Sequence, residues 1–223
     1  LVRPLSIGPK TTINANKIAF DLEYTGNYVI EYNGNADQAI HLFANPIETN
    51  PISAEDAKKD SNIVYIGPGI YNAGAIPTAA GKTIYLAGGA YVYGQIRAEG
   101  IDGLTIRGRG IIDGSIYERR SESEYTIPVV TRNVTNLVIE DIAFFDPAGW
   151  VLNIYKCTNV TINNVKIISA RANSDGISIQ SCSHVRVNGG FVRSWDDSLV
   201  VKNVDRGVTS DVVFDGVSVW TDL

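Results

Sequence analysis

The sequence predicts an all-β protein, a right-handed parallel β-helix that is preceded by an N-terminal antiparallel β-sandwich-like module. Strand-like segments recur about every 25 residues from residue 100 onward, each repeat holds three short strands, and no segment shows the period of an α-helix. Equivalent positions in four successive repeats lie 23, 25 and 27 residues apart: Leu137, Val160, Val185 and Val212. Since one such coil cannot bury its own apolar face, stacking of the coils must supply the core.

The chain is expected to divide into the N-terminal module, residues 1–75, and the β-helix, residues 76–223. Residues 28–32 show a loose alternation and are followed by Asn33-Gly34-Asn35, which favours an antiparallel β-module. A β-sandwich throughout is the competing architecture, but it favours two-residue hairpin turns every 8–12 residues.

Two polar stretches are expected to be loops. Residues 49–60 contain Pro51 and a mixture of acidic and basic side chains. Residues 117–127 interrupt the repeat and are rich in charge, so they form either a solvated loop or a loop beside a cleft.

Alternation assigns a direction to each side chain of the third strand in three successive repeats. Polar steps between the strands of a repeat, such as Asn163-Asn164 and Asn188-Gly189, suit residues that are forced to positive φ. The residues expected to face the core are Leu152, Ile154, Ile177, Ile179, Leu199 and Val201, and those expected to face outward are Asn153, Tyr155, Ser178, Gln180, Val200 and Lys202.

The composition argues against several classes of partner. A net charge of −5, a pI near 5.0 and the lack of a basic cluster longer than Arg119-Arg120 disfavour nucleic-acid binding. No apolar run approaches the roughly 20 residues that span a bilayer, so no membrane partner is expected. The chain has two His and two Cys without metal-ligand or redox spacing, and we expect neither a metal nor a cofactor. Cys157 and Cys182 lie one repeat apart, which fits either two stacked hydrophobic side chains or a disulfide.

Both ends of the chain suggest a part of a larger product. The chain begins at Leu1 without a starting Met or a signal peptide, so we expect a mature or trimmed form of a secreted or periplasmic protein. It ends at Leu223 within a repeat, where a bare coil would expose an apolar edge. We therefore expect a missing C-terminal β-helix segment, or a second chain, to cap the last coil.

Three carboxylates recur at the start of two successive third strands. Alignment of these strands on their inward residues puts Trp150, Asp175 and Asp197 in one column and Asp196 beside it. Adjacent coils lie about 4.8 Å apart, so the three Asp should converge. Like charges at this spacing raise each other's pKa, which lets one carboxyl hold a proton while another activates water, as hydrolysis of a glycosidic bond requires. Asp side chains that cap turns, or a calcium site, would explain the same cluster.

Five further residues are candidates for substrate binding. The indoles of Trp150 and Trp195 can stack on sugar rings, although burial in a turn is the alternative for each. Gln180 and Lys202 are expected to stack outward on one sheet and to bind sugar hydroxyls, with an ion pair to Asp197 as the alternative for Lys202. Asn173 lies on the loop that leads to Asp175. The small residues Gly176 and Ser198 are expected to leave space for a ligand.

Two segments resemble motifs of known families. Asn173-Ser174-Asp175-Gly176 resembles the Asn-Thr-Asp-Gly motif of the polygalacturonase family, glycoside hydrolase family 28, and Trp195-Asp196-Asp197-Ser198 resembles its Asp-Asp motif. Residues 41–46, 65–69 and 85–94 resemble the entry into the β-helix in the dextranase and isopullulanase family, glycoside hydrolase family 49. The family-28 Gly-His-Gly and Arg-Ile-Lys motifs do not occur before Leu223, so the dextranase branch fits better.

The resemblance implies an inverting glycoside hydrolase that cleaves an α-linked polysaccharide of the dextran, pullulan or pectin type. It assigns Asp196 as the general acid, and Asp175 and Asp197 as the pair that positions and deprotonates water. Two alternatives stay open: a non-catalytic β-helical scaffold for carbohydrate binding or adhesion, which includes an inactive fragment, and a polysaccharide lyase.

Overall fold

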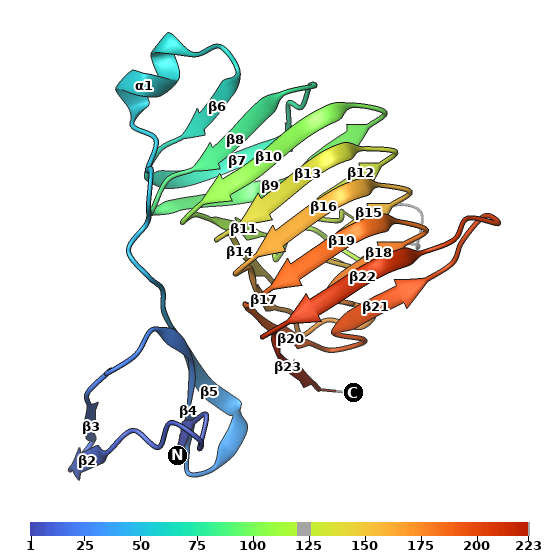
Figure 1. Cartoon of the computed structure of the whole chain (residues 1–223). Coiled ribbons are helices and arrows are strands. Elements are labelled where there is room, and N and C mark those ends of the chain that lie inside the picture. Colours follow the sequence, from blue (N-terminus) through green and yellow to red (C-terminus); the bar gives the residue numbers. More distant parts are fainter. Residues whose placement is uncertain (120–125, 223) are drawn as a thin grey trace. The chain divides into compact units, whose positions relative to one another are not determined.

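The computed structural model describes residues 1–119 and 126–222 and confirms the predicted fold class. Its contacts divide the chain into two compact units, Leu1–Asn50 and Pro51–Leu223. Figure 1 shows antiparallel strands in the first unit and stacked parallel coils in the second. Residues 120–125 of the predicted loop at 117–127 lie outside the described residues.

The first unit contains two antiparallel sheets, with strand orders β1-β4-β5 and β2-β3. Asn33 and Gly34 join β4 to β5 at positive φ values of 50° and 72°, as a tight two-residue hairpin turn requires. Tyr28 of β4 is buried, and its hydroxyl donates to the carbonyl oxygen of Tyr24 at 2.9 Å. The strands are β1 (Val2–Arg3), β2 (Thr11–Asn14), β3 (Lys17–Phe20), β4 (Gly26–Tyr32) and β5 (Asn35–Ala44).

The second unit is a parallel β-helix whose first strands form one sheet, in the order β22-β19-β16-β13-β10-β8-β6. The segment predicted as a domain boundary, near residue 75, lies in β7, which pairs in parallel with β9; the boundary itself stays a prediction. The first strands are β6 (Ile63–Ile66), β8 (Lys82–Leu86), β10 (Asp102–Gly108), β13 (Thr135–Glu140), β16 (Thr158–Asn163), β19 (Ser183–Asn188) and β22 (Ser210–Asp215).

The second and third strands are joined into one further sheet, because the long strand β9 takes part in both ladders. All of its pairings are parallel within the described residues. The second-strand ladder contains β7 (Gly69–Ile76), β9 (Ala90–Glu99), β11 (Ile111–Asp113), β14 (Ala143–Phe145), β17 (Lys166–Ile168), β20 (Phe191–Ser194) and β23 (Ser218–Thr221), and the third-strand ladder continues from β9 through β12 (Val129–Arg132), β15 (Leu152–Tyr155), β18 (Ile177–Gln180) and β21 (Leu199–Lys202).

The register of the coils is the predicted one. In the first-strand sheet, Val160 faces Leu137 and Val185, and Val185 faces Val212. In the third-strand ladder, Ile177 faces Leu152 on one side and Leu199 on the other. This register decides which polar residues meet at the ends of the strands.

A column of polar residues opens the first strands of four successive coils. All four members have left-handed backbone, with φ values between 52° and 57°. Asn side chains adopt this conformation at low cost and bond to one another across coils, as when the amide of Asn159 donates to Oδ1 of Asn136. At the other end, Nδ1 of His184 lies 2.7 Å from Oδ2 of Asp211. We call this set the first-strand polar column: Asn136, Asn159, His184 and Asp211.

The third strands contribute to the core as the alternation predicts, except at the last one. Leu152, Ile154 and Ile177 are fully buried in the central cluster, as is Ile179, while Leu199 packs against it. Val201, predicted to be inside, is 52 % exposed because β21 is an edge strand in the described part of the sheet. The prediction of burial at that position is wrong.

Residues 54–59, predicted to be part of a loop, form the short helix α1 (Ala54–Lys59). Oγ of Ser53 accepts a hydrogen bond from the backbone N–H of Asp56 at 3.1 Å and so caps the first turn. Acidic side chains lie in the first turn and basic ones in the last, which favours the helix dipole. The loop prediction missed this capping pattern.

Two further predictions concern the cysteines and membranes. Cys157 and Cys182 are free thiols that stack in the core, where the backbone N–H of Cys157 donates to Sγ of Cys182 at 3.3 Å. The described residues contain no helix that is long and apolar enough to cross a bilayer.

Candidate active site

The column that opens the third strands brings two carboxylates onto neighbouring coils. The parallel ladder continues beyond the strand ends, since the N–H of Val151 donates to the carbonyl of Asp175 and the N–H of Gly176 donates to the carbonyl of Asp197, both at 2.9 Å. Asp175 therefore lies on the coil that precedes the coil of Asp197, at the equivalent position, as the alignment predicts. We call Trp150, Asp175 and Asp197 the third-strand column.

Asp175 is the buried member of the acidic group, with 5 % of its surface exposed. Burial, together with the nearby charges of Asp196 and Asp197, raises the pKa of Asp175 to about 6, while the Lys202 ammonium acts in the opposite direction. The three carboxylates and Lys202 thus form one electrostatic group. A carboxyl with such a pKa exchanges its proton in the mildly acidic range.

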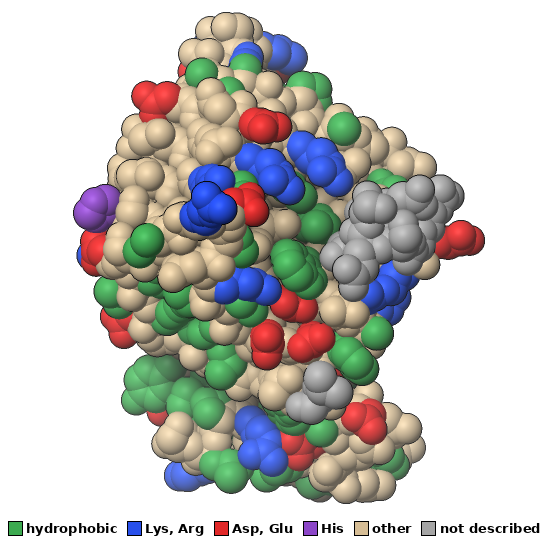
Figure 2. All heavy atoms as spheres, turned by 90° about the vertical axis from the view of Figure 1, so that its right-hand side faces the viewer, with side chains coloured by type: hydrophobic (Ala, Val, Ile, Leu, Met, Phe, Trp, Pro, Cys, Tyr) green, Lys and Arg blue, Asp and Glu red, His purple; other side chains and the backbone are tan. Residues whose placement is uncertain are grey.

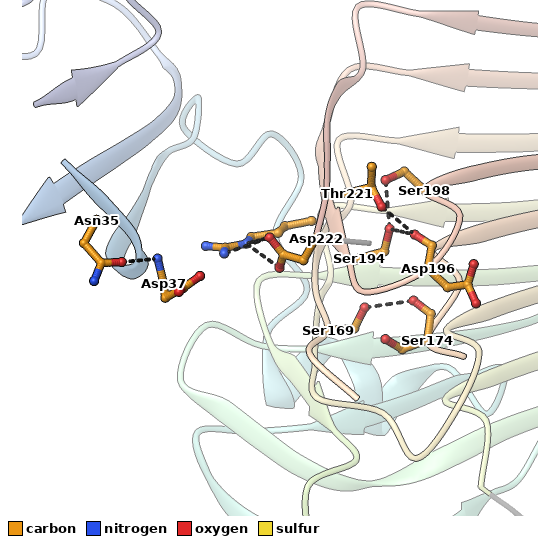
Figure 3. A network of polar contacts seen from close by, with 10 residues as sticks. Asn35, Asp37, Ser169, Ser174, Ser194, Asp196, Ser198, Thr221 and Asp222 are labelled. Atoms are coloured by element: carbon orange, nitrogen blue, oxygen red, sulfur yellow. Dashed lines mark hydrogen bonds and ion pairs between the residues drawn. The ribbon is translucent and has the colours of Figure 1, made fainter. Parts of the chain in front are cut away.

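A hydrogen-bonded turn holds Asp196 (Figure 3). Oγ of Ser194 donates to the carbonyl of Asp196 at 2.6 Å and lies 2.8 Å from Oγ of Ser198. The Asp196 carboxylate accepts the N–H of Asp197 at 2.9 Å. Its backbone is thereby fixed, and Figure 3 shows its side chain directed away from the serines.

A second serine has the corresponding role one coil earlier. Oγ of Ser169 donates to the carbonyl of Ser174 at 3.0 Å, next to Asp175 (Figure 3). The N–H of Ser169 donates to the carbonyl of Arg193, which places Ser169 and Ser194 side by side on adjacent coils. The sequence reasoning missed these buried serines, although their spacing of one repeat was a usable signal.

Trp150 and Lys202, both predicted to bind substrate, meet in the structure. Nζ of Lys202 lies 4.6 Å from the centre of the Trp150 ring, a cation–π distance. Lys202 pairs with Gln180 in the ladder, as the outward stacking of these two residues predicts, and its role in substrate binding stays a prediction. Figure 2 shows carboxylates beside basic and hydrophobic side chains on the face turned toward the viewer.

The other three binding candidates are placed differently. Gln180 faces outward but is buried, and its amide donates to Oδ1 of Asn153 at 2.6 Å. Asn173 is exposed at a φ of 57°, and its Oδ1 accepts a hydrogen bond from Nη2 of Arg119 at 2.7 Å. Trp195 is partly exposed beside Asp196.

Gly176 does not leave the predicted space for a ligand. A Cβ at this position would lie 2.4 Å from Cγ1 of Val192 and 2.5 Å from the carbonyl oxygen of Ser198. The glycine is therefore required by close packing of adjacent coils beneath the carboxylates. The prediction that it opens a binding space is wrong.

One residue outside the predicted set connects the loops near Asp175. The guanidinium of Arg171 donates to the carbonyls of Tyr117 and Gly114, each at 2.7 Å, and also to the carbonyl of Asp146. Its position on the approach loop was visible in the sequence, but its partners were not, because they come from two other coils. Among the described residues, no three His, Cys, Asp or Glu side chains are grouped as ligands of one metal ion.

Comparison with known proteins agrees with the fold and with the family resemblance. Polygalacturonases from Gossypium barbadense and Gossypium hirsutum are 27 % and 26 % identical to this chain over 117 residues, or 48 % of it. The match spans 29 % of the length of each of these curated relatives.

Three solved structures share the fold. A putative glycosyl hydrolase from Parabacteroides merdae has a TM-score of 0.60 at 19 % identity, covering 70 % of this chain and 80 % of its own. The polygalacturonase from Erwinia carotovora has a TM-score of 0.57 at 12 % identity, and the match covers 71 % of this chain and 53 % of that polygalacturonase. Dex49A from Penicillium minioluteum has a TM-score of 0.59 at 15 % identity, and the match covers 97 % of this chain and 54 % of Dex49A.

A family model provides the assignment. The model described as glycosyl hydrolases family 28 matches residues 79–218, which is more than half of the chain and includes all three aspartates. The chain belongs to glycosyl hydrolases family 28.

Proposed function

We propose that the chain carries the catalytic centre of an inverting glycoside hydrolase that cleaves an α-linked polysaccharide. The observation that carries the proposal is the acidic group itself: a buried Asp175 whose pKa is raised to about 6, beside Asp196 and Asp197. Hydrolysis of a glycosidic bond needs one carboxyl that gives a proton and one that takes a proton from water. Carboxyls with unequal environments on neighbouring coils can supply both.

The proposed roles follow the family motif. Asp196 donates a proton to the leaving oxygen, and Asp175 with Asp197 orients a water molecule and removes its proton. The raised pKa of Asp175 supports the second role, because a base works best when its proton affinity is close to the operating pH. An attack by water on the face opposite the leaving group inverts the anomeric carbon.

The substrate is proposed as a class. The name of the Gossypium relatives points to a galacturonan, whereas the fold shared with Dex49A over 97 % of the chain allows a neutral glucan. Lys202, beside the acidic group, is a candidate partner for a uronate carboxylate or for sugar hydroxyls. A polymeric substrate would place the reaction outside the cytoplasm, in the secreted or periplasmic space.

The test is the release of reducing ends from polygalacturonate, dextran and pullulan. The wild-type chain should hydrolyse at least one of them, and Asp196→Asn should lower the rate by about 10²- to 10⁴-fold. Asp211→Asn, the same substitution in the first-strand polar column, is the matched control and should keep the activity. Full activity in Asp196→Asn would remove that residue from the reaction, and unsaturated products would identify a lyase.

A second experiment separates the acid from the base. A substrate with a good leaving group, such as an aryl glycoside of the sugar in the polysaccharide that the wild-type chain hydrolyses, needs no protonation of the leaving oxygen. Asp196→Asn should recover most of its rate on such a substrate, while Asp175→Asn should not. The opposite pattern would exchange the two roles.

A further inference from the structure

The guanidinium of Arg171 joins three loops that follow the second strands of successive coils. Nη1 donates to the carbonyl oxygen of Tyr117 and Nη2 to that of Gly114, each at 2.7 Å. Nη2 also donates to the carbonyl oxygen of Asp146, whose Oδ1 lies 3.4 Å from Nε. Tyr117 and Gly114 follow β11, Asp146 follows β14, and Arg171 itself follows β17.

The turn that begins at Arg171 leads directly to the buried carboxylate. The N–H of Ser174 donates to the carbonyl of Arg171 at 3.1 Å, and Asn173 has left-handed backbone. The Ser169 hydroxyl fixes the carbonyl of Ser174. Asp175 is the next residue, so a displacement of Arg171 reaches its carboxyl through a short, hydrogen-bonded segment.

We propose that Arg171 is a positioning residue for the hydrolysis: it ties three coil loops together and so sets the depth at which the Asp175 carboxyl lies beside Asp196. The inference rests on the proposed function. The contact set requires an arginine, because a planar guanidinium offers five N–H donors in a fixed geometry, whereas a lysine ammonium is a single point at the end of a flexible stem.

The test compares Arg171→Lys with a matched control, Arg186→Lys. Arg186 makes similar contacts on the other sheet: its guanidinium donates to the carbonyls of Val185 and Asp211 and to the Asp211 carboxylate. A general cost of replacing a bonded arginine by lysine would appear in both variants. Asp146→Asn, which removes the carboxylate partner of Arg171, is a milder second variant in case Arg171→Lys does not fold.

Two readouts are needed. In Arg171→Lys, kcat should fall about 10- to 100-fold while KM changes less than about twofold, because small misplacements of a reacting group are costly. Independently of activity, ¹³C NMR of the Asp175 carboxyl, assigned with Asp175→Asn, should show its pKa falling from about 6 toward 3.8 as water enters the loosened loop. Arg186→Lys should keep the wild-type kcat and the wild-type pKa of Asp175. Asp146→Asn should change both quantities in the same direction as Arg171→Lys, but by a smaller amount.

The outcomes separate the two proposals. A wild-type chain that hydrolyses no substrate, combined with the shifted Asp175 titration in Arg171→Lys, would remove the proposed function and keep Arg171 as the residue that positions Asp175. An unchanged Asp175 titration in a folded Arg171→Lys would overturn the inference, whatever the activity. If Arg171→Lys is unfolded, an unchanged titration in Asp146→Asn overturns it instead.

Discussion

Two columns of polar residues run across the same stacked coils with nearly the same spacing, yet they differ in chemistry. In the first-strand polar column, side chains of neighbouring coils bond to one another, and the Asp211 carboxylate is hydrogen-bonded to His184 and ion-paired with Arg186. In the third-strand column, Asp175 and Asp197 carry like charges, and Asp175 is buried and forms no ion pair with any described residue.

The same stacking of repeats gives the carboxylates of the two columns different electrostatic environments. Both columns follow from the same rule, that a stacked coil places every residue above its counterpart one turn earlier. In the first-strand polar column, repetition produces partners that lower the pKa of Asp211. In the third-strand column, repetition produces repulsion and burial that raise the pKa of Asp175. A repeated carboxylate is therefore a candidate for a reaction site when its neighbours do not neutralise it.

The largest expected contrast is in activity. Asp175→Asn should lower kcat by about 10²- to 10⁴-fold on whichever of the three polysaccharides the wild-type chain hydrolyses, since it removes a group that accepts a proton. Asp211→Asn should leave kcat within about twofold. Initial rates on the same polysaccharide measure both, and equal losses would show that the two columns do not differ in function.

A packing change beneath the carboxylates should come next. Gly176→Ala forces a Cβ against Val192 and the backbone of Ser198, at 2.4 and 2.5 Å, and should lower the free energy of unfolding by about 1–3 kcal/mol. Gly189→Ala is the comparison in the turn between β19 and β20, where no atom lies within 4 Å of the added Cβ, although its φ of 60° adds a smaller backbone cost. Denaturant unfolding measures both, and a smaller loss in Gly176→Ala than in Gly189→Ala would contradict the packing described here.

The two aspartates should also differ in the sign of their effect on stability. Asp175 keeps its proton up to about pH 6 in the folded protein but releases it near pH 3.8 when unfolded, so the free energy of unfolding should fall as the pH rises through this window. Asp175→Asn should therefore stabilise the protein at pH 7 by about 1–2 kcal/mol, which allows for partial access of water.

Asp211 should show the opposite behaviour. Its pKa is lowered by hydrogen bonds from His184 and Arg186, so its contribution to stability is present above the unfolded pKa and is lost as the pH falls through the folded value. Asp211→Asn should be destabilising at pH 7. Thermal unfolding of both variants between pH 3 and 8 checks the signs, and the same sign for both would remove the distinction between the columns.

The smallest expected effect belongs to Lys202. Its ammonium lowers the pKa of Asp175, so Lys202→Met should raise that pKa and move the pH dependence of kcat toward higher pH. The pH–rate profile measures the shift, and a shift toward lower pH would contradict the assigned charge interaction.

Much of the β-helix was predictable because stacking turns a sequence period into a spatial register. The pairing of Ile177 with Leu152 and Leu199 on the neighbouring strands follows from counting residues. The column that contains Asp175 and Asp197 follows in the same way. The role of Gly176 did not follow, because its neighbour Val192 belongs to another strand of the coil. Likewise, the contacts of Arg171 depend on loops of irregular length, for which the period gives no register.

The central claim is that the three aspartates perform an inverting hydrolysis, and the anomeric form of the first products tests it most directly. ¹H NMR of an α-linked polysaccharide during the first minutes of reaction should show new reducing ends in the β form, and Asp196→Asn should produce none at the same protein concentration. New ends in the α form would contradict inversion, and unchanged production of ends by Asp196→Asn would contradict the site.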